Sequence, residues 1–384
     1  HWQAQGSDSL WQIPGRRKPL TSLDRMFTPM ESGLGGLLIG WSAALAYLGD
    51  GKITGISGIA GPFLRGVGAC QPLKDGQLWK ALFLVGLVLG GVLNFFFNQD
   101  FAYPEALDIS VARYCMGGVL VGMGTRAGRG CTSGHGICGL PRLSPRSWVA
   151  VPTFMGIAAG TVAVTRHAAR LDPSGPWQVA ELQWPPQWQF PVAAAASSLV
   201  LTLLAVFLPS RPRSFVSPLV CGIIFGLGLG VSGMTSQSKV LDFLDFAGTW
   251  DPSLAFVMGL GLCVSFPAFL LAEREGQMPL CGEKCSFEKP SKTGDYGSLV
   301  LGATSFGLGW GMVGICPGPA LAGLIPYLAS GYGPGLSFGL CVVMILASWL
   351  VTDKVIRHMN ERQATTPVVV VNHLNVSPPP DENA

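Results

Sequence analysis

Charged side chains are scarce in this sequence. Asp, Glu, Lys and Arg make up 12% of its 384 residues, whereas soluble domains carry about 25%. Hydrophobic residues account for 49%, and the mean hydropathy is +0.42. Apolar runs of about 20 residues, the length that a helix needs to cross a bilayer, recur along most of the chain. The composition therefore predicts an all-α polytopic membrane protein.

Two functional signatures are also missing. No G-x-x-x-x-G-K-[ST] motif is present, so we expect no nucleotide-driven pump. No basic stripe with interleaved aromatic residues appears, and the net charge is only +3, so nucleic acid is not an expected partner. We expect no cofactor.

The ten cysteines are not spaced as a disulfide framework. Four of them lie inside apolar runs, where we interpret them as small packing residues: Cys115, Cys221, Cys263 and Cys341. Cys281 and Cys285 lie in a polar loop over residues 274–296, and they fit a disulfide, a weak metal site or a pair of free thiols.

The chain contains 52 glycines and 29 prolines, which in lipid are tolerated where helices pack closely or break around a cavity. Four Gly- or Pro-broken apolar stretches indicate re-entrant half-helices, at 54–64, 131–140, 239–247 and 316–326. About nine membrane-spanning helices are predicted, near 32–49, 79–97, 113–127, 147–165, 190–208, 217–233, 252–271, 297–313 and 335–352.

Two halves of the chain, residues 32–210 and 211–352, resemble each other. An offset of about 185 residues superposes two glycine patterns and one cysteine. The first predicted span pairs with the sixth, five crossings later, so the halves enter the membrane from opposite sides and the repeat is inverted. The matched pairs are Gly36 with Gly222, Gly40 with Gly226, Gly122 with Gly307, Gly124 with Gly309, and Cys131 with Cys316.

The basic residues indicate an orientation. Most of the 25 Lys and Arg residues fall on the side of this nine-span arrangement that holds the C-terminus. The positive-inside rule makes that side cytoplasmic, so the N-terminal segment 1–31 is expected outside. The tail 353–384 is expected to be cytoplasmic and disordered. A plasma membrane, or a bacterial inner membrane, is the predicted location.

The densest motif is GRGCTSGHGICGLPRLSPRS, residues 128–147. Its glycines and its position at the start of a broken helix expose backbone N–H groups that favour an anion. A thiol adds a weak donor and a polarizable sulfur, suited to brief contact with a sulfur-containing substrate. A Gly-rich packing turn is the structural alternative. The candidate residues here are Arg129, Cys131, Thr132, Ser133, Gly134, His135 and Cys138.

A metal site is a further alternative for this motif. Cys131, His135 and Cys138 are spaced to share one helical face, but no acidic partner or fourth ligand is nearby, so no metal is predicted. We interpret His135 as a hydrogen-bonded structural or gating residue in preference to a catalytic base.

A second motif, FGLGWGMVGICPGPALAGL at residues 306–324, repeats this arrangement with simpler chemistry. Cys316 stands at the end of a Gly-rich span, and Pro317 with Gly318 begins a new half-helix. A proline-kinked span with a buried cysteine is the alternative. Weaker candidates for the path are Ser57, Ser232 and Met234, for which simple packing is an equal interpretation.

These motifs carry a family resemblance. GRGCTSGHGICGLPRLSPRS, with GKITGISGIAG upstream, resembles the sulfur-transport family of YeeE/YedE type, whose characterised members resemble thiosulfate permeases. FGLGLGVSGMTSQSKVLDFLDFAGTWDPSLAFVMG, with FGLGWGMVGICPGPALAGL, resembles the companion half that some bacteria encode separately. The resemblance implies an hourglass of inverted repeats with a narrow midplane passage, in which Cys131 and Cys316 hand thiosulfate along through S–H···S contacts.

One departure from the family pattern bears on the substrate. Some members have a further cysteine near the outer entrance, but the first span here, WSAALAYLGDGK, has none. Persulfide, sulfide and sulfite therefore stay open beside thiosulfate.

Two functions follow from these residues. The first is a non-enzymatic permease for a small inorganic sulfur anion, in which Arg129 and backbone N–H groups attract the substrate and a cytoplasmic protein accepts the sulfur. The second is a membrane sulfurtransferase with Cys131 as nucleophile, since a helix start and Arg129 would lower a thiol pKa.

Overall fold

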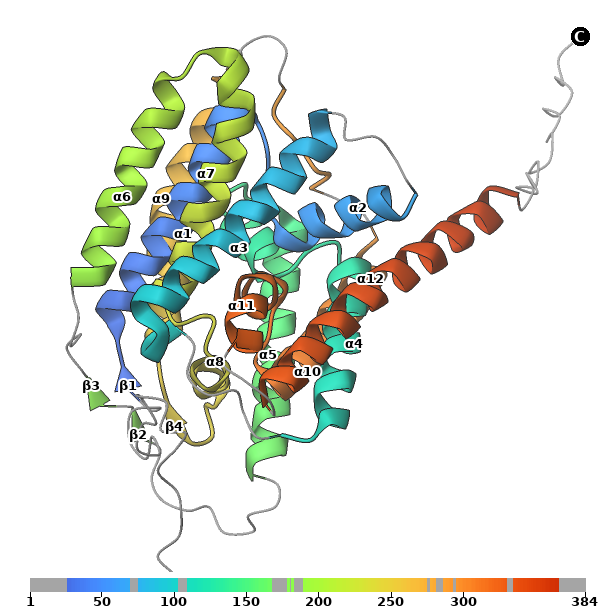
Figure 1. The fold of residues 1–384 in the computed structure, drawn as a ribbon. Helices are drawn as coiled ribbons and strands as arrows, with labels where there is room; N and C mark the ends of the chain where they lie inside the picture. Colours follow the sequence, from blue (N-terminus) through green and yellow to red (C-terminus); the bar gives the residue numbers. More distant parts are fainter. Residues whose placement is uncertain are drawn as a thin grey trace, which may run out of the picture.

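The computed structural model describes residues 26–69, 75–102, 109–167, 178–179, 181–182, 189–274, 277–280, 286–292, 295–329 and 334–365. Cys281, Cys285, the first 25 residues and the last 19 lie outside this part of the chain. The fold is helical (Figure 1), and its first half contains β1 Met26–Phe27, α1 Pro29–Asp50, α2 Ile56–Gly68, α3 Asp75–Ala102, α4 Val111–Ala127, the π-helix η1 Thr132–Gly139, α5 Pro145–His167, β2 Gln178–Val179, β3 Glu181–Leu182 and α6 Gln189–Phe207. The second half contains α7 Ser210–Val231, α8 Gln237–Leu244, β4 Thr249–Trp250, α9 Ser253–Ala272, α10 Tyr296–Val313, α11 Pro317–Ala329 and α12 Pro334–Thr365.

The prediction of an all-α polytopic membrane protein is confirmed. Eight segments in the described part of the chain are long and apolar enough to cross a membrane, judged by length and composition. Each of the nine predicted spans coincides with a helix, and the span at 113–127 is α4, which is not among the eight. α4 has 17 residues and is therefore only about 25 Å long, less than the ~30 Å thickness of the hydrocarbon core. It is short because the chain breaks directly after it.

The four broken stretches form the short elements α2, η1, α8 and α11. Each follows a long helix after a turn of a few residues, and three of the turns contain a glycine with positive φ: Gly51, Gly233 and Gly314. A glycine adopts this left-handed conformation without the steric cost that a Cβ brings, so the helix ends abruptly and the chain reverses.

At the C-terminus α12 continues to Thr365, so residues 353–365 of the tail predicted to be disordered are helical.

The helix packing keeps the same pattern when the two halves are exchanged. α1 packs on α9 and α3 packs on α7, while α5 packs on α10 and α4 packs on α12. α1 and α7 contact each other, as do α4 and α10. α1 and α7 run antiparallel, because Ser32 Oγ donates to Ser232 O at 3.2 Å and Ser42 Oγ donates to Cys221 O at 2.7 Å. α6 has no counterpart in this pattern and lies outside, against α7 and α1 (Figure 1).

Glycines that the sequence pairs between the halves lie at corresponding helix crossings. A Cβ on Gly36 would lie 2.5 Å from the Val257 carbonyl oxygen, and a Cβ on Gly222 would lie 2.1 Å from the Phe83 carbonyl oxygen. Gly40 meets Gly261 in the same way, at 2.4 Å. The association of helices in lipid is stabilised mainly by close backbone contact. At these crossings only glycine, which has no side chain, permits that contact.

Charged residues gather at the two ends of the bundle. At one end Lys52 pairs with Glu288 at 3.0 Å, and Arg142 pairs with Glu273 at 3.3 Å. At the opposite end the charged groups come from α5, α8 and the chain before α9. The two-residue strands also lie there, with β1 parallel to β3 and β2 parallel to β4.

Gly222→Ala is expected to lower the free energy of unfolding by about 1–3 kcal/mol, because the added methyl forces the backbones of α3 and α7 apart. Gly156→Ala on α5 is the matched control, since its Cβ meets nothing within 4 Å. The measurement is thermal or denaturant unfolding in detergent micelles. Equal stability of the two variants would show that the crossing tolerates a side chain.

Candidate functional site

The chain breaks in the same manner before two buried thiols, one in each half. Cys131 precedes η1 and Cys316 precedes α11, and their exposed fractions are 1% and 3%. The carbonyl oxygen of Cys131 accepts from His135 N, and that of Cys316 accepts from Ala320 N, both at 2.9 Å. The two cysteines paired by the sequence repeat thus occupy the same position at the start of a short helix.

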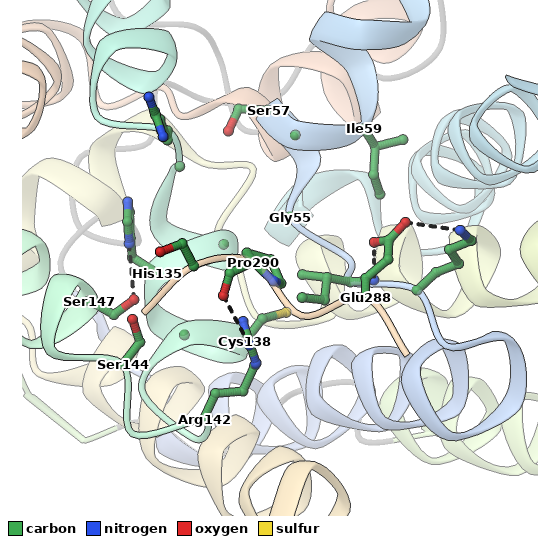
Figure 2. A pocket seen from close by; sticks show the side chains of 18 of the residues that line it. Gly55, Ser57, Ile59, His135, Cys138, Arg142, Ser144, Ser147, Glu288 and Pro290 are labelled. Carbon is green, nitrogen blue, oxygen red and sulfur yellow. Dashed lines mark hydrogen bonds and ion pairs between the residues drawn. The ribbon is translucent and has the colours of Figure 1, made fainter. Parts of the chain in front are cut away.

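A cavity of about 380 Å³ opens beside the first break (Figure 2). Its walls come from the segment before α2, from α2 itself, from the start of α3, from residues 129–147 and from residues 288–291. Five cationic side chains line it and one carboxylate, Glu288, faces them; the cations are Lys52, Lys80, Arg129, Arg142 and Arg146. The excess of positive charge makes this cavity attractive to a small anion.

A second cavity, of about 20 Å³, lies on the other side of η1. It holds about one water molecule, since such a molecule needs at least ~10–15 Å³. Apolar side chains from α1, α2, α7 and α9 dominate the wall, with Met234, Met258 and Cys316 providing sulfur atoms. Thr132 and Ser133 are the polar side chains in the wall.

η1 forms the partition between the two cavities. Thr132, Ser133 and Ile137 face the small cavity, whereas Gly134, His135 and Cys138 face the large one. Gly55 allows the start of α2 to approach η1 closely, because a Cβ on Gly55 would lie 3.2 Å from Gly134 Cα. Gly-rich chain therefore separates the two cavities.

Each of the three thiols near this partition contacts one hydroxyl group. Thr132 Oγ1 donates to Cys316 Sγ at 3.5 Å and so links the two halves. Cys131 Sγ lies 3.3 Å from Ser133 Oγ, and Cys138 Sγ lies 3.5 Å from Thr54 Oγ1. Cys316 lies on the wall of the small cavity and Cys138 on the wall of the large one, whereas Cys131 is buried and lines neither.

His135 ties the turn before η1 to the start of α5. Its Nε2 lies 3.1 Å from the Gly128 carbonyl oxygen and must donate to it, so in the neutral ring Nδ1 accepts from Ser147 Oγ, also at 3.1 Å. A Cβ on Gly130 would lie 2.5 Å from the ring. Both ring nitrogens are engaged within the protein. The interpretation of His135 as a structural or gating residue stays a prediction.

Arg129 has an unusual backbone conformation, with φ at 58°. The residue at the same place in the second half is Gly314, with φ at 68°. For a residue with a side chain, the left-handed region costs about 1–3 kcal/mol and is found mostly at functional sites. The first half therefore keeps a strained arginine on the wall of the large cavity where the second half has glycine.

The structure divides the predicted site residues into three groups. Those on the large cavity are Ser57, Arg129, Gly134, His135 and Cys138. Those on the small cavity are Thr132, Ser133, Met234, Cys316 and Gly318. Those on neither wall are Cys131, which is buried in the partition, Pro317, and Ser232, whose Oγ donates to Leu229 O at 3.0 Å within a helix end.

Sequence reasoning missed several residues of these walls. Lys52, Lys80 and Glu288 lie far apart in the chain, and only the fold brings them to the large cavity. Met258 lies in the middle of an apolar span, where no sequence signal separates it from lipid-facing residues. The sulfur of Met234 was predicted from a Gly-flanked break, a local signal that Met258 lacks.

The fold and the two cavities define a multi-pass integral membrane protein with broken helices around a narrow, sulfur-lined partition. Residues 10–163 match the family described as sulphur transport, and residues 214–364 match a family of unknown function (DUF6691). The chain belongs to the sulphur-transport family of YeeE/YedE type.

Bacterial relatives correspond to little more than a third of this chain. One protein of Xylella fastidiosa, named a probable transporter, is 41% identical over 143 residues, which are 37% of this chain and 91% of the relative. Another probable transporter of Xylella fastidiosa is 42% identical over 132 residues, which are 33% of this chain and 90% of the relative. This chain is thus much longer than either of these relatives.

Arg129→Gly is expected to leave the free energy of unfolding unchanged or to raise it by up to about 1 kcal/mol, because backbone strain is relieved. It is also expected to weaken the binding of a sulfur oxyanion at least about fivefold, because a cavity cation is lost. Thermal unfolding and equilibrium binding of labelled thiosulfate measure the two effects.

Leu143→Gly is the control, because exposed Leu143 also has a positive φ, 50°, but carries no charge. It should gain stability without losing anion affinity. An equal loss of affinity in both glycine variants would contradict the role of the charge.

Proposed function

We propose that this protein carries thiosulfate across the bilayer through the partition between the two cavities. Membership of the sulphur-transport family makes it a membrane transporter of sulfur compounds. The observation that carries the finer proposal is the contact of Thr132 Oγ1 with Cys316 Sγ, because it joins a broken helix of each half at the wall of the small, sulfur-lined cavity.

Attraction of the substrate comes from charge in the large cavity. Arg142 and Lys52 are partly engaged with Glu273 and Glu288, and the cations outnumber the one carboxylate in the wall. The N-cap residues of α2 and η1, Gly55 and Cys131, make no side-chain cap hydrogen bond of their own, and the dipoles of these helices add to the attraction. Several moderate contacts suit transport better than one tight site, because the anion must also leave.

Selection comes from sulfur. The small cavity presents a thiol and two thioethers in an apolar wall. A soft sulfur atom of the substrate gains dispersion contacts and weak S–H interactions there. An oxyanion without such an atom loses the same hydration but makes fewer favourable contacts with the wall. This favours thiosulfate over sulfate.

Passage requires the partition to move. A cavity for about one water molecule is too small for a polyatomic anion. η1 is a π-helix with three glycines, and such helices are short, irregular and frequent at functional sites. We infer that η1 shifts while the long helices stay packed.

The architecture that supports this function is an inverted repeat. The unchanged packing after exchange of the halves, the antiparallel α1 and α7, and the matched glycine crossings all favour it. We infer that the large cavity faces the cytoplasm, because its cations belong to the side favoured by the positive-inside rule. A cytoplasmic sulfur-acceptor protein would then receive the substrate there.

Cys131→Ala and Cys316→Ala are each expected to reduce the uptake of ³⁵S-labelled thiosulfate into proteoliposomes by at least about 100-fold, since each removes a contact needed only during passage. Cys263→Ala is the matched control, because Cys263 is an exposed free thiol on α9. Unchanged uptake in both passage variants would reject the thiol path.

Competition by sulfate, sulfite and sulfide in the same assay identifies the substrate. A stable persulfide on Cys131 after exposure to thiosulfate, detected by mass spectrometry, would instead favour a sulfurtransferase.

Gly58→Cys tests the orientation. A Cβ on Gly58 meets nothing within 4 Å and points into open space at the large cavity. A membrane-impermeant maleimide should label this variant in inside-out vesicles and not in right-side-out vesicles, with unmodified protein as the background control. Labelling only from the outside would reverse the proposed orientation.

A further inference from the structure

A group of buried charged side chains lies at the end of the bundle opposite the large cavity. Its four carboxylates are Glu31, Asp242, Asp245 and Asp251, with exposed fractions between 1% and 6%. Lys239 Nζ pairs with Asp251 at 3.1 Å, and Arg166 pairs with Asp242 at 2.6 Å and Asp245 at 3.1 Å. His167 Nε2 lies 2.7 Å from Asp245. Carboxylates outnumber the permanently charged cations in this group.

Glu31 differs from the other carboxylates of the group. It is 6% exposed, and its Oε2 has no hydrogen-bond partner within the described structure. Asp251 accepts from Lys239 and also from Ser253, so the nearest cation to Glu31 is already engaged. A buried carboxylate without such partners is costly in its charged form, so a proton is the ligand that this side chain fits.

Two opposing effects keep Glu31 able to exchange that proton. Burial disfavours the charged carboxylate, whereas its position in the first turn of α1 favours it. Glu31 is therefore not held in either state by a strong partner. Lys239 on α8 is the charged group that acts on Glu31, and it pairs with Asp251. Asp242, Asp245, Arg166 and His167, in the same region, pair with one another.

The position of Glu31 connects it to the substrate path. The neighbouring Ser32 bonds Ser232 O, in the turn that carries Met234 into the small cavity. Ile39, two turns further along α1, lines the same cavity. A negative charge on Glu31 would repel an approaching anion and draw Lys239 away from Asp251, whereas a protonated Glu31 would do neither.

We propose that Glu31 is a proton-binding site that couples the passage of the anion to the pH on its own side of the membrane. The coupling rests on the proposed function, whereas the proton site does not. Binding moves one proton from water to a carboxylate oxygen and changes no other bond.

Glu31→Gln tests the inference, because the amide imitates the protonated side chain in size and charge. Labelled-thiosulfate counterflow in proteoliposomes should increase as the pH on the Glu31 side falls from 8 to 5.5 in the unmodified protein, by up to about tenfold per unit, the limit for one titrating group. In Glu31→Gln it should stay near the acid value at every pH. Glu361→Gln, the same change at an exposed position of α12, should keep the unmodified profile.

Infrared difference spectra upon a pH step provide a readout that needs no substrate. The unmodified protein and Glu361→Gln should show a protonated carboxyl band that Glu31→Gln lacks. Absence of that difference, or an unmodified pH profile in Glu31→Gln, overturns the proposal. A band assigned to Glu31 without any thiosulfate counterflow confirms the proton site and rejects thiosulfate transport.

Discussion

A helix that ends inside a bilayer leaves backbone N–H and C=O groups without partners, and the rest of this structure depends on how they are satisfied. Ile56 N at the start of α2 donates to Ser133 Oγ of η1, so one broken helix caps another. α8 is capped by its own Ser236, whose Oγ accepts from Lys239 N. α11 begins with Pro317 and contains Pro319, which have no N–H to satisfy. Each break is thus possible only because protein surrounds it.

The long helices form a close frame around these breaks. Their contacts are made through glycines whose positions leave no room for a Cβ, so the frame resists small displacements. Ion pairs with buried carboxylates hold the two short helices α2 and α8 to this frame, with the cation on α2 in one case and the carboxylate on α8 in the other. Asp353 on α12 binds Arg65 on α2 and Arg126 on α4, whereas Arg166 on α5 binds Asp242 on α8. A rigid frame with clamped short helices leaves η1 as the element best suited to move.

The two halves share a fold but not their chemistry. In the first half the break contains glycines, hydroxyls and Arg129, and it adjoins a cavity rich in cations. In the second half the corresponding break contains Gly314 and two prolines, and it adjoins an apolar cavity lined with sulfur. In the proposed function, an anion would meet strong electrostatic attraction on one side of η1 and soft, weakly polar contacts on the other. Such a difference between the two sides would allow one substrate to be drawn in, desolvated and released.

The apolar helices and the points where they break could be predicted from the sequence, because hydropathy, glycine and proline act locally along the chain. For the same reason Cys131 and Cys316 were assigned to the starts of short helices. The pairing of the halves as an inverted repeat stays a prediction. Which side chains face which cavity was decided by tertiary packing: Ser232 turns into a helix end, while Met258 and Glu288 reach the walls. Lys239 acts on Glu31 only because α8 and α1 both pack against α9. These arrangements depend on contacts between residues far apart in the chain, and no local pattern encodes them.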